Sequence, residues 1–134
     1  KIVLSPEQRA VLDLVKSGRN VFFTGSAGTG KSVLLREIIE HCGGRHSNPL
    51  AITAATGIAS VNIGGCTLHS WAGIGLGKES QEQILGKLLG QDKYLRHKER
   101  FMPDGQQSQN RVVSRWKQVR TLIIDESEYR CLPI

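Results

Sequence analysis

The stretch that decides the fold is Gly25-Ser-Ala-Gly-Thr-Gly-Lys-Ser32, which fits the pattern Gly-x-x-x-x-Gly-Lys-Ser/Thr. The pattern is typical of a loop that binds phosphate groups, because its glycines let the backbone turn successive N–H groups toward an anion. A helix that begins at Lys31 would add its positive dipole end. The alternative is a glycine-rich turn with an incidental lysine. The stretch predicts a nucleotide site formed by Gly25, Ser26, Ala27, Gly28, Thr29, Gly30, Lys31 and Ser32.

Particular side chains of this site have chemistry that suits a bound nucleotide. Lys31 would place its ammonium on the β and γ phosphates, and the Ser32 hydroxyl would ligate Mg²⁺. Asp125-Glu126 follows an apolar run, at the edge of a sheet where a phosphate loop also lies. Asp125 would hold the Mg²⁺ through water, and Glu126 would orient and deprotonate the attacking water. The alternative for this acidic pair is a solvated strand end.

Three apolar runs predict strands. Val21-Phe-Phe-Thr24 stands directly before the phosphate loop and predicts a buried strand. Residues 50–54 predict a second strand, and residues 119–124 predict another buried strand that ends at the acidic pair. Because these runs alternate with helical patterns, the expected fold class is α/β with a parallel sheet.

Helices are expected on both sides of the loop. Ser5 can cap the first, with Pro6 at its first position and Gln8 placed as the capping-box partner. The apolar stripes of these two helices are Ala10, Val11, Leu14 and Val15 in the first, and Leu34, Leu35, Ile38 and Ile39 in the second. Short helices are expected at residues 57–62 and after Thr67. Polar, basic helices are expected between residues 78 and 117, around a turn at residues 103–105.

Composition narrows the class of protein. The chain has 134 residues, of which 39% are hydrophobic and 22% charged, as in one globular domain. No apolar run is long enough for a membrane helix and no signal peptide is visible, so we expect no membrane partner. Three cysteines without a Cys-x-x-Cys pair favour a reducing, intracellular compartment, and His41, Cys42 and His46 lack zinc spacing.

The net charge is +6, and most of the basic surplus falls in residues 78–120. A basic surplus suits a polyanion such as nucleic acid, although a solvated helix face has the same composition.

Five ordered motifs carry a resemblance to a known family. The phosphate loop and Leu122-Ile-Ile-Asp-Glu126 are joined by Leu4-Ser-Pro-Glu-Gln8, Ile52-Thr-Ala-Ala-Thr-Gly-Ile-Ala59 and Ile63-Gly-Gly-Cys-Thr-Leu-His-Ser-Trp-Ala-Gly-Ile-Gly75. Together they closely resemble the first motor domain of Pif-type helicases, superfamily-one enzymes that use ATP to move 5′ to 3′ on single-stranded DNA. The resemblance implies a partial RecA-like P-loop NTPase domain over residues 1–126. It also implies Mg²⁺, single-stranded or forked DNA, and roles in DNA repair, recombination or telomere maintenance, in the nucleus or mitochondrion if the source is eukaryotic.

The resemblance also assigns roles to single residues. Gln8 would read the adenine edge, although a capping-box partner of Ser5 belongs at the same position. Thr56 and Gly57 resemble the motif that meets the DNA backbone. Thr67 and His69 resemble the next DNA-contacting motif, although a lone histidine is usually structural.

Two further features have the residue types for DNA contacts. The Trp71 side chain is of a kind that can stack on DNA bases, but a buried tryptophan beside Leu68 is the favoured interpretation. The basic stretch at residues 93–100 could touch DNA, and a solvated helix face is the favoured alternative.

The sequence departs from the family pattern after Glu126. We expect residues 127–134 to be a non-family tail and the motor domain to be incomplete at its C-terminus. A strand that normally lies between the phosphate-loop strand and the Asp-Glu strand would then be missing, so the chain alone is expected to be inactive and prone to aggregation. Two other functions stay open: a self-sufficient P-loop NTPase outside the helicases, and a non-catalytic product that binds nucleotide.

The acidic pair gives the first testable prediction. In an otherwise complete enzyme with these residues, Glu126→Gln should slow ATP hydrolysis by at least ~100-fold while ATP and DNA binding persist, because the amide cannot take a proton from water. Asp125→Asn should instead weaken Mg²⁺-dependent binding. Steady-state hydrolysis and equilibrium binding separate the two effects, and an unchanged turnover in Glu126→Gln would assign the base to another residue.

Overall fold

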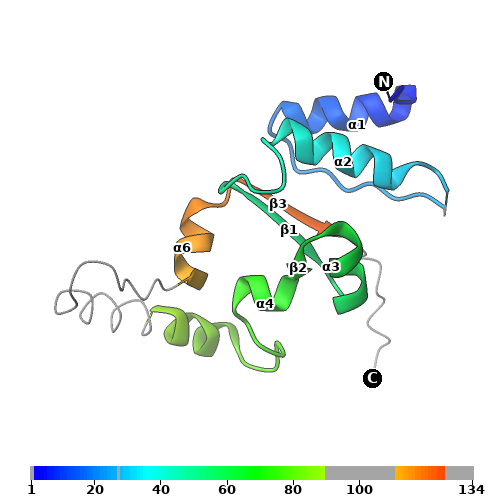
Figure 1. The fold of residues 1–134 in the computed structure, drawn as a ribbon. Helices are drawn as coiled ribbons and strands as arrows, with labels where there is room; N and C mark the ends of the chain where they lie inside the picture. Colours follow the sequence, from blue (N-terminus) through cyan, green and yellow to red (C-terminus); the bar gives the residue numbers. More distant parts are fainter. Residues whose placement is uncertain (1, 27, 90–110, 126–134) are drawn as a thin grey trace. The chain divides into compact units, whose positions relative to one another are not determined.

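A computed structural model of the chain describes residues 2–26, 28–89 and 111–125 (Figure 1). The chain divides into two compact units, residues 1–50 and 51–134. Several predicted features lie outside the described residues, namely Ala27, the basic stretch 93–100, the turn at 103–105, Glu126 and the tail 127–134. Among the helices that are described, we find none with the length and apolar character that crossing a membrane requires.

The first unit is a pair of helices, α1 (Pro6–Lys16) and α2 (Lys31–His41), which lie side by side (Figure 1). The predicted start of α1 is confirmed. Ser5 caps it, the Gln8 N–H donates to Ser5 Oγ at 3.2 Å, and the Ser5 N–H donates to Gln8 Oε1 at 2.8 Å. In α2 the predicted stripe is confirmed at Leu34, Ile38 and Ile39, which are buried, whereas Leu35 is only partly buried.

The predicted stripe of α1 is partly wrong. Ala10 and Leu14 are exposed, whereas Leu12, which the prediction left out, is the buried residue of the helix at 7% exposure. The buried side is therefore rotated toward the line of Val11, Leu12 and Val15. The reason is that both sets of residues have helical spacing, and only the packing of α1 on α2 selects between them.

The strand predicted at residues 21–24 is also wrong. Among the described residues it belongs to none of the three strands, and Phe22 is 74% exposed. Val21 and Phe23 are partly buried while Phe22 and Thr24 are exposed, so burial alternates as it does along an extended chain, although the segment belongs to no described strand. An apolar run supplies side chains for a strand, but a strand also requires a neighbouring backbone to pair with.

The second unit contains a three-stranded sheet with the order β2-β1-β3, formed by β1 (Leu50–Ala54), β2 (Cys66–Thr67) and β3 (Thr121–Asp125) (Figure 1). Strand β1 pairs in parallel with β2, with Thr53 opposite Cys66 and Ala54 opposite Thr67. Thr53 Oγ1 donates to the Ile123 carbonyl at 2.7 Å, and the Ala55 N–H donates to the Asp125 carbonyl at 3.2 Å. Because both bonds advance in the same direction, β3 is parallel to β1. The predicted α/β class with a parallel sheet is confirmed.

Burial differs between the strands. All five residues of β1 are buried, since the strand lies between the other two. Strand β3 was predicted to be buried, yet its residues are only partly covered and Ile124 is 42% exposed. The difference follows from position, because β3 is an outer strand of the described sheet.

Short helices connect and cover these strands. Helix α3 (Gly57–Ile63) follows β1, and α4 (Leu68–Ala72) follows β2, both near their predicted places. Two of the predicted polar helices are present, at residues 81–89 and as α6 (Arg111–Gln118). Trp71 is 5% exposed in a core with Ala51 and Ala72, which confirms the buried interpretation. The ring centroids of Trp116 and Trp71 are 4.7 Å apart, and Trp116 Nε1 donates to the Ala72 carbonyl at 3.1 Å.

Gly65 gives a stability prediction, because it approaches the backbone of β1 too closely for any side chain. A Cβ there would collide with the Ile52 carbonyl oxygen and lie 2.8 Å from the carbonyl carbon. Gly65→Ala should therefore lower the free energy of unfolding by about 1–3 kcal/mol. Gly86→Ala is the matched control, since Gly86 lies in the 81–89 helix with open space around it and should be neutral or slightly stabilising. Urea unfolding measures both, and equal midpoints would contradict the predicted collision.

Candidate functional site

The phosphate loop leads directly into α2 through a left-handed turn. Gly28 and Gly30 have φ of +80° and +85°, and Gly30 is the N-cap of the helix. Glycine has no side chain to cap the helix, so the first N–H groups of α2 receive no side-chain acceptor from this position. The first turn of α2 holds no acidic residue that would repel an anion. The geometry suits phosphate oxygens, which these N–H groups and the helix dipole would attract.

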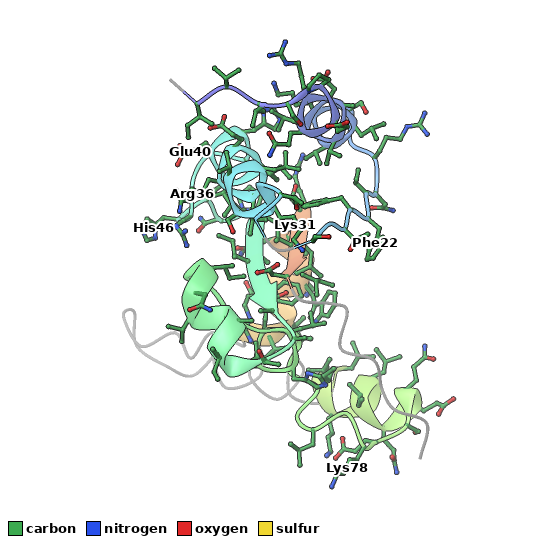
Figure 2. All side chains as sticks on the ribbon, turned by 90° about the vertical axis from the view of Figure 1, so that its right-hand side faces the viewer. Phe22, Lys31, Arg36, Glu40, His46 and Lys78 are labelled. Carbon is green, nitrogen blue, oxygen red and sulfur yellow. The ribbon has the colours of Figure 1, made fainter. Side chains whose placement is uncertain are left out.

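Bonds within the loop hold it in a compact form. Thr29 Oγ1 donates to the Ser26 carbonyl at 2.7 Å, and the Thr29 N–H approaches the same oxygen at 3.3 Å. The Lys31 ammonium donates to the Gly25 carbonyl, so its charge is held across the loop. Figure 2 shows Lys31 at the start of α2, and Phe22 on the segment that leads into the loop. Lys31 and Ser32 are both exposed, so a ligand could reach them.

Gln8 connects α1 to this loop. Its Nε2 donates to the Gly30 carbonyl at 3.0 Å, while its Oε1 accepts the Ser5 N–H. The capping-box role considered for Gln8 is thus confirmed. The contact with Gly30 was missed by sequence reasoning, because the two residues are 22 positions apart and no local pattern relates them.

In the second unit, candidate residues gather at the carboxyl edge of the sheet. Asp125 is the last residue of β3 and half-buried, Thr67 is the last residue of β2, and Thr56 follows β1 by two positions. The strands are parallel, so these three positions share one edge, where parallel sheets commonly bind ligands. The edge offers a carboxylate and two hydroxyl groups.

Both threonines are helix N-caps. Thr56 Oγ1 accepts the Ala59 N–H at 3.2 Å at the start of α3, and Thr67 Oγ1 accepts the Ser70 N–H at 3.3 Å at the start of α4. A hydroxyl that accepts a cap bond still carries a proton that it can donate, for example to a phosphate oxygen. Gly57 is exposed at the first position of α3, and His69 is exposed on α4.

The predicted site residues therefore form two sets. The first unit brings Gln8 together with the loop of residues 25–32, and the second brings Asp125 together with the two threonines. Glu126 and Ala27 lie outside the described residues. Within residues 2–26, 28–89 and 111–125, no group of three or more His, Cys, Asp or Glu side chains could hold a metal ion.

Comparison with known proteins identifies a family whose sequences match this chain. A sequence model of the family described as PIF1-like helicase matches residues 3–101. The chain is 46% identical over 125 residues to the ATP-dependent DNA helicase PIF1 of Candida albicans, which covers 93% of this chain and 12% of that protein. It is 56% identical over 85 residues to the PIF1 helicase of Xenopus laevis, covering 63% of this chain and 13% of that one.

Solved structures of the same family are similar to this chain in fold. The crystal structure of Pif1 helicase from Candida albicans matches with a TM-score of 0.69 at 44% identity, over 92% of this chain and 24% of that chain. A structure described as two coordinating Pif1 helicases unwinding forked dsDNA matches with a TM-score of 0.59 at 27% identity, with the same coverage. The chain spans 12–13% of the length of the two curated relatives.

The cap at Thr56 gives a prediction about stability. Thr56→Val keeps the shape of the side chain but removes the acceptor of the Ala59 N–H, and Ala59 is only 2% exposed. The free energy of unfolding should fall by about 1 kcal/mol, whereas Thr56→Ser should retain most of it. Chemical denaturation of the two variants side by side measures this difference. Indistinguishable stabilities would mean that the hydroxyl does not hold the start of α3.

Proposed function

Because the chain belongs to the PIF1-like helicase family, we propose that it forms the ATP- and DNA-binding part of an ATP-dependent DNA helicase. Family membership decides against a P-loop NTPase outside the helicases. The parent enzyme would couple ATP hydrolysis to 5′-to-3′ movement on single-stranded DNA, with roles in repair, recombination or telomere maintenance. A DNA substrate would place it in the nucleus, the mitochondrion or both, if the source is eukaryotic.

One observation carries the proposal, namely the glycine-capped start of α2 in front of Lys31. The left-handed turn at Gly30 leaves the first N–H groups of the helix without a side-chain acceptor, and Lys31 adds a positive charge beside them. A nucleoside triphosphate presents oxygens that fit both kinds of donor. Lys31 would bind the β and γ phosphates in place of the Gly25 carbonyl.

The donor chemistry also suits Mg²⁺. The Ser32 hydroxyl is a hard oxygen ligand of the kind that Mg²⁺ takes, and the Asp125 carboxylate would hold such an ion through water. Bound Mg²⁺ would neutralise charge on the β and γ phosphates. Glu126 would then orient and deprotonate the attacking water.

Gln8 retains capacity to recognise adenine. A glutamine amide has two N–H groups and two lone pairs on its oxygen, and the bonds to Gly30 and Ser5 use one of each. One donor and one acceptor remain, which is the pair that the adenine edge requires. The capping role and the adenine role are therefore compatible in one side chain.

DNA would bind along the carboxyl edge of the sheet in the second unit. The hydroxyls of Thr56 and Thr67, the exposed N–H of Gly57 and the side chain of His69 would meet the phosphate backbone. These contacts read no base sequence, as suits an enzyme that moves along DNA. The proposed partner is single-stranded or forked DNA, and the net charge of +6 supports a polyanion.

Replacing Lys31 tests the nucleotide site. Lys31→Ala should weaken ATP binding by at least ~10-fold, because only backbone donors would remain at the phosphates. Lys87→Ala is the control, since Lys87 lies on the 81–89 helix, pairs with Glu79 just before that helix, and should leave binding unchanged. Calorimetric titration with Mg-ATP measures both variants. Equal ATP affinity in Lys31→Ala and the unsubstituted chain would overturn the assignment, and binding without hydrolysis would identify a non-catalytic nucleotide-binding product.

A further inference from the structure

The Gly30 carbonyl joins two segments of the first unit. It accepts the Leu34 N–H at 3.1 Å, which is the first hydrogen bond of α2, and it accepts Gln8 Nε2 at 3.0 Å. The same oxygen therefore belongs to the phosphate loop, to the helix behind it and to the start of α1. A displacement of the Gln8 amide would therefore remove a hydrogen bond from the Gly30 carbonyl and change the position of the loop.

The Gln8 side chain is well fixed for this purpose. Its oxygen accepts the Ser5 N–H at 2.8 Å, and its own N–H donates to Ser5 Oγ at 3.2 Å. These two bonds orient the amide, and the third bond points its nitrogen at Gly30. The residue is half-buried, so water competes less for the contact than it would on an open surface.

The approach between the two residues is close. Gly30 has φ of +85°, and a Cβ there would collide with Gln8 Nε2. The Gln8 amide thus lies directly against the left-handed turn that gives the phosphate loop its shape. Any side chain at Gly30 would disturb both the turn and the amide contact.

We propose that Gln8 is a positioning residue for the phosphate loop, holding the Gly30 turn in place whether or not a base is bound. Its effect on ligand binding rests on the proposed nucleotide site, whereas the contact itself does not. The role is distinct from reading adenine, because it predicts that Gln8 affects an anion that has no base. Through this amide, a well-ordered start of α1 would hold the loop in its folded shape.

Gln8→Glu removes the donor to Gly30 and keeps the capping oxygen. Glutamate keeps the oxygen that accepts the Ser5 N–H, and it is a normal capping-box partner of serine, so α1 should keep its start. The Nε2 donor is lost, and a carboxylate oxygen would face the Gly30 carbonyl instead. Gln83→Glu is the matched control, because Gln83 forms the same capping box with Ser80 and the bonds seen for it among the described residues stay within that box.

Amide hydrogen exchange of the nucleotide-free chain is the first measurement. The Leu34 amide reports on Gly30, and the Arg9 amide, which donates to the Ser5 carbonyl at 2.9 Å, reports on α1. Gln8→Glu should speed exchange at Leu34 by roughly three- to tenfold, the scale of one lost hydrogen bond, and leave Arg9 unchanged. Gln83→Glu should change neither. Unchanged exchange at Leu34, equal acceleration at both amides, or an unprotected Leu34 amide in the unsubstituted chain would overturn the proposal.

Binding of inorganic tripolyphosphate is the second measurement, since this anion carries phosphates and no base. Its affinity should fall roughly three- to tenfold in Gln8→Glu and also in the uncharged Gln8→Met, which lacks the Nε2 donor without repelling an anion, and stay the same in Gln83→Glu. A loss of ATP affinity with full tripolyphosphate affinity would assign Gln8 to adenine alone and overturn the positioning role. If the unsubstituted chain binds neither anion, the proposed nucleotide site fails, and the exchange rates at Leu34 and Arg9 still decide the positioning role.

Discussion

The left-handed turn at Gly30 is the constraint on which the first unit depends. It ends the phosphate loop, starts α2 without a side-chain cap, and presents its carbonyl to both Leu34 and Gln8. Positive φ at this position strongly favours glycine, and a Cβ there would also displace the Gln8 amide. The left-handed glycine turn and the uncapped helix start thus suit the site to phosphate and also fix its shape.

The second unit depends on a buried polar contact in a similar way. Thr53 is fully buried in β1, and its hydroxyl is satisfied by the Ile123 carbonyl of β3. A buried hydroxyl without a partner would be costly, so this bond favours one register between the two strands. That register sets where β3 ends, and hence where Asp125 lies beside Ala55. The position of a candidate metal ligand follows from a residue that would itself touch no ligand.

Helix capping recurs at the candidate contacts. Thr56 and Thr67 each begin a short helix with the hydroxyl that family resemblance assigns to DNA, and Ser5 and Gln8 begin α1 beside the phosphate loop. In the proposed function one side chain would serve both local structure and binding, because a cap bond uses only part of its hydrogen-bonding capacity. Substitution at these positions will change stability and binding together unless the replacement keeps the capping oxygen.

Local chemistry in the sequence determined the phosphate loop, the capping box at Ser5 and the short helix after Thr67, and the alternation of apolar runs with helical patterns determined the parallel α/β class. The local features depend on residue types at fixed short spacing, and the fold class depends on the order of the elements along the chain. Tertiary structure decided the rest. Packing buried Leu12 in α1 and left Leu14 exposed. Strand pairing included residues 121–125 and left out residues 21–24. The contact of Gln8 with Gly30 joined positions that are far apart in the chain. These outcomes depend on which surfaces meet, and hydrophobic periodicity does not specify a partner.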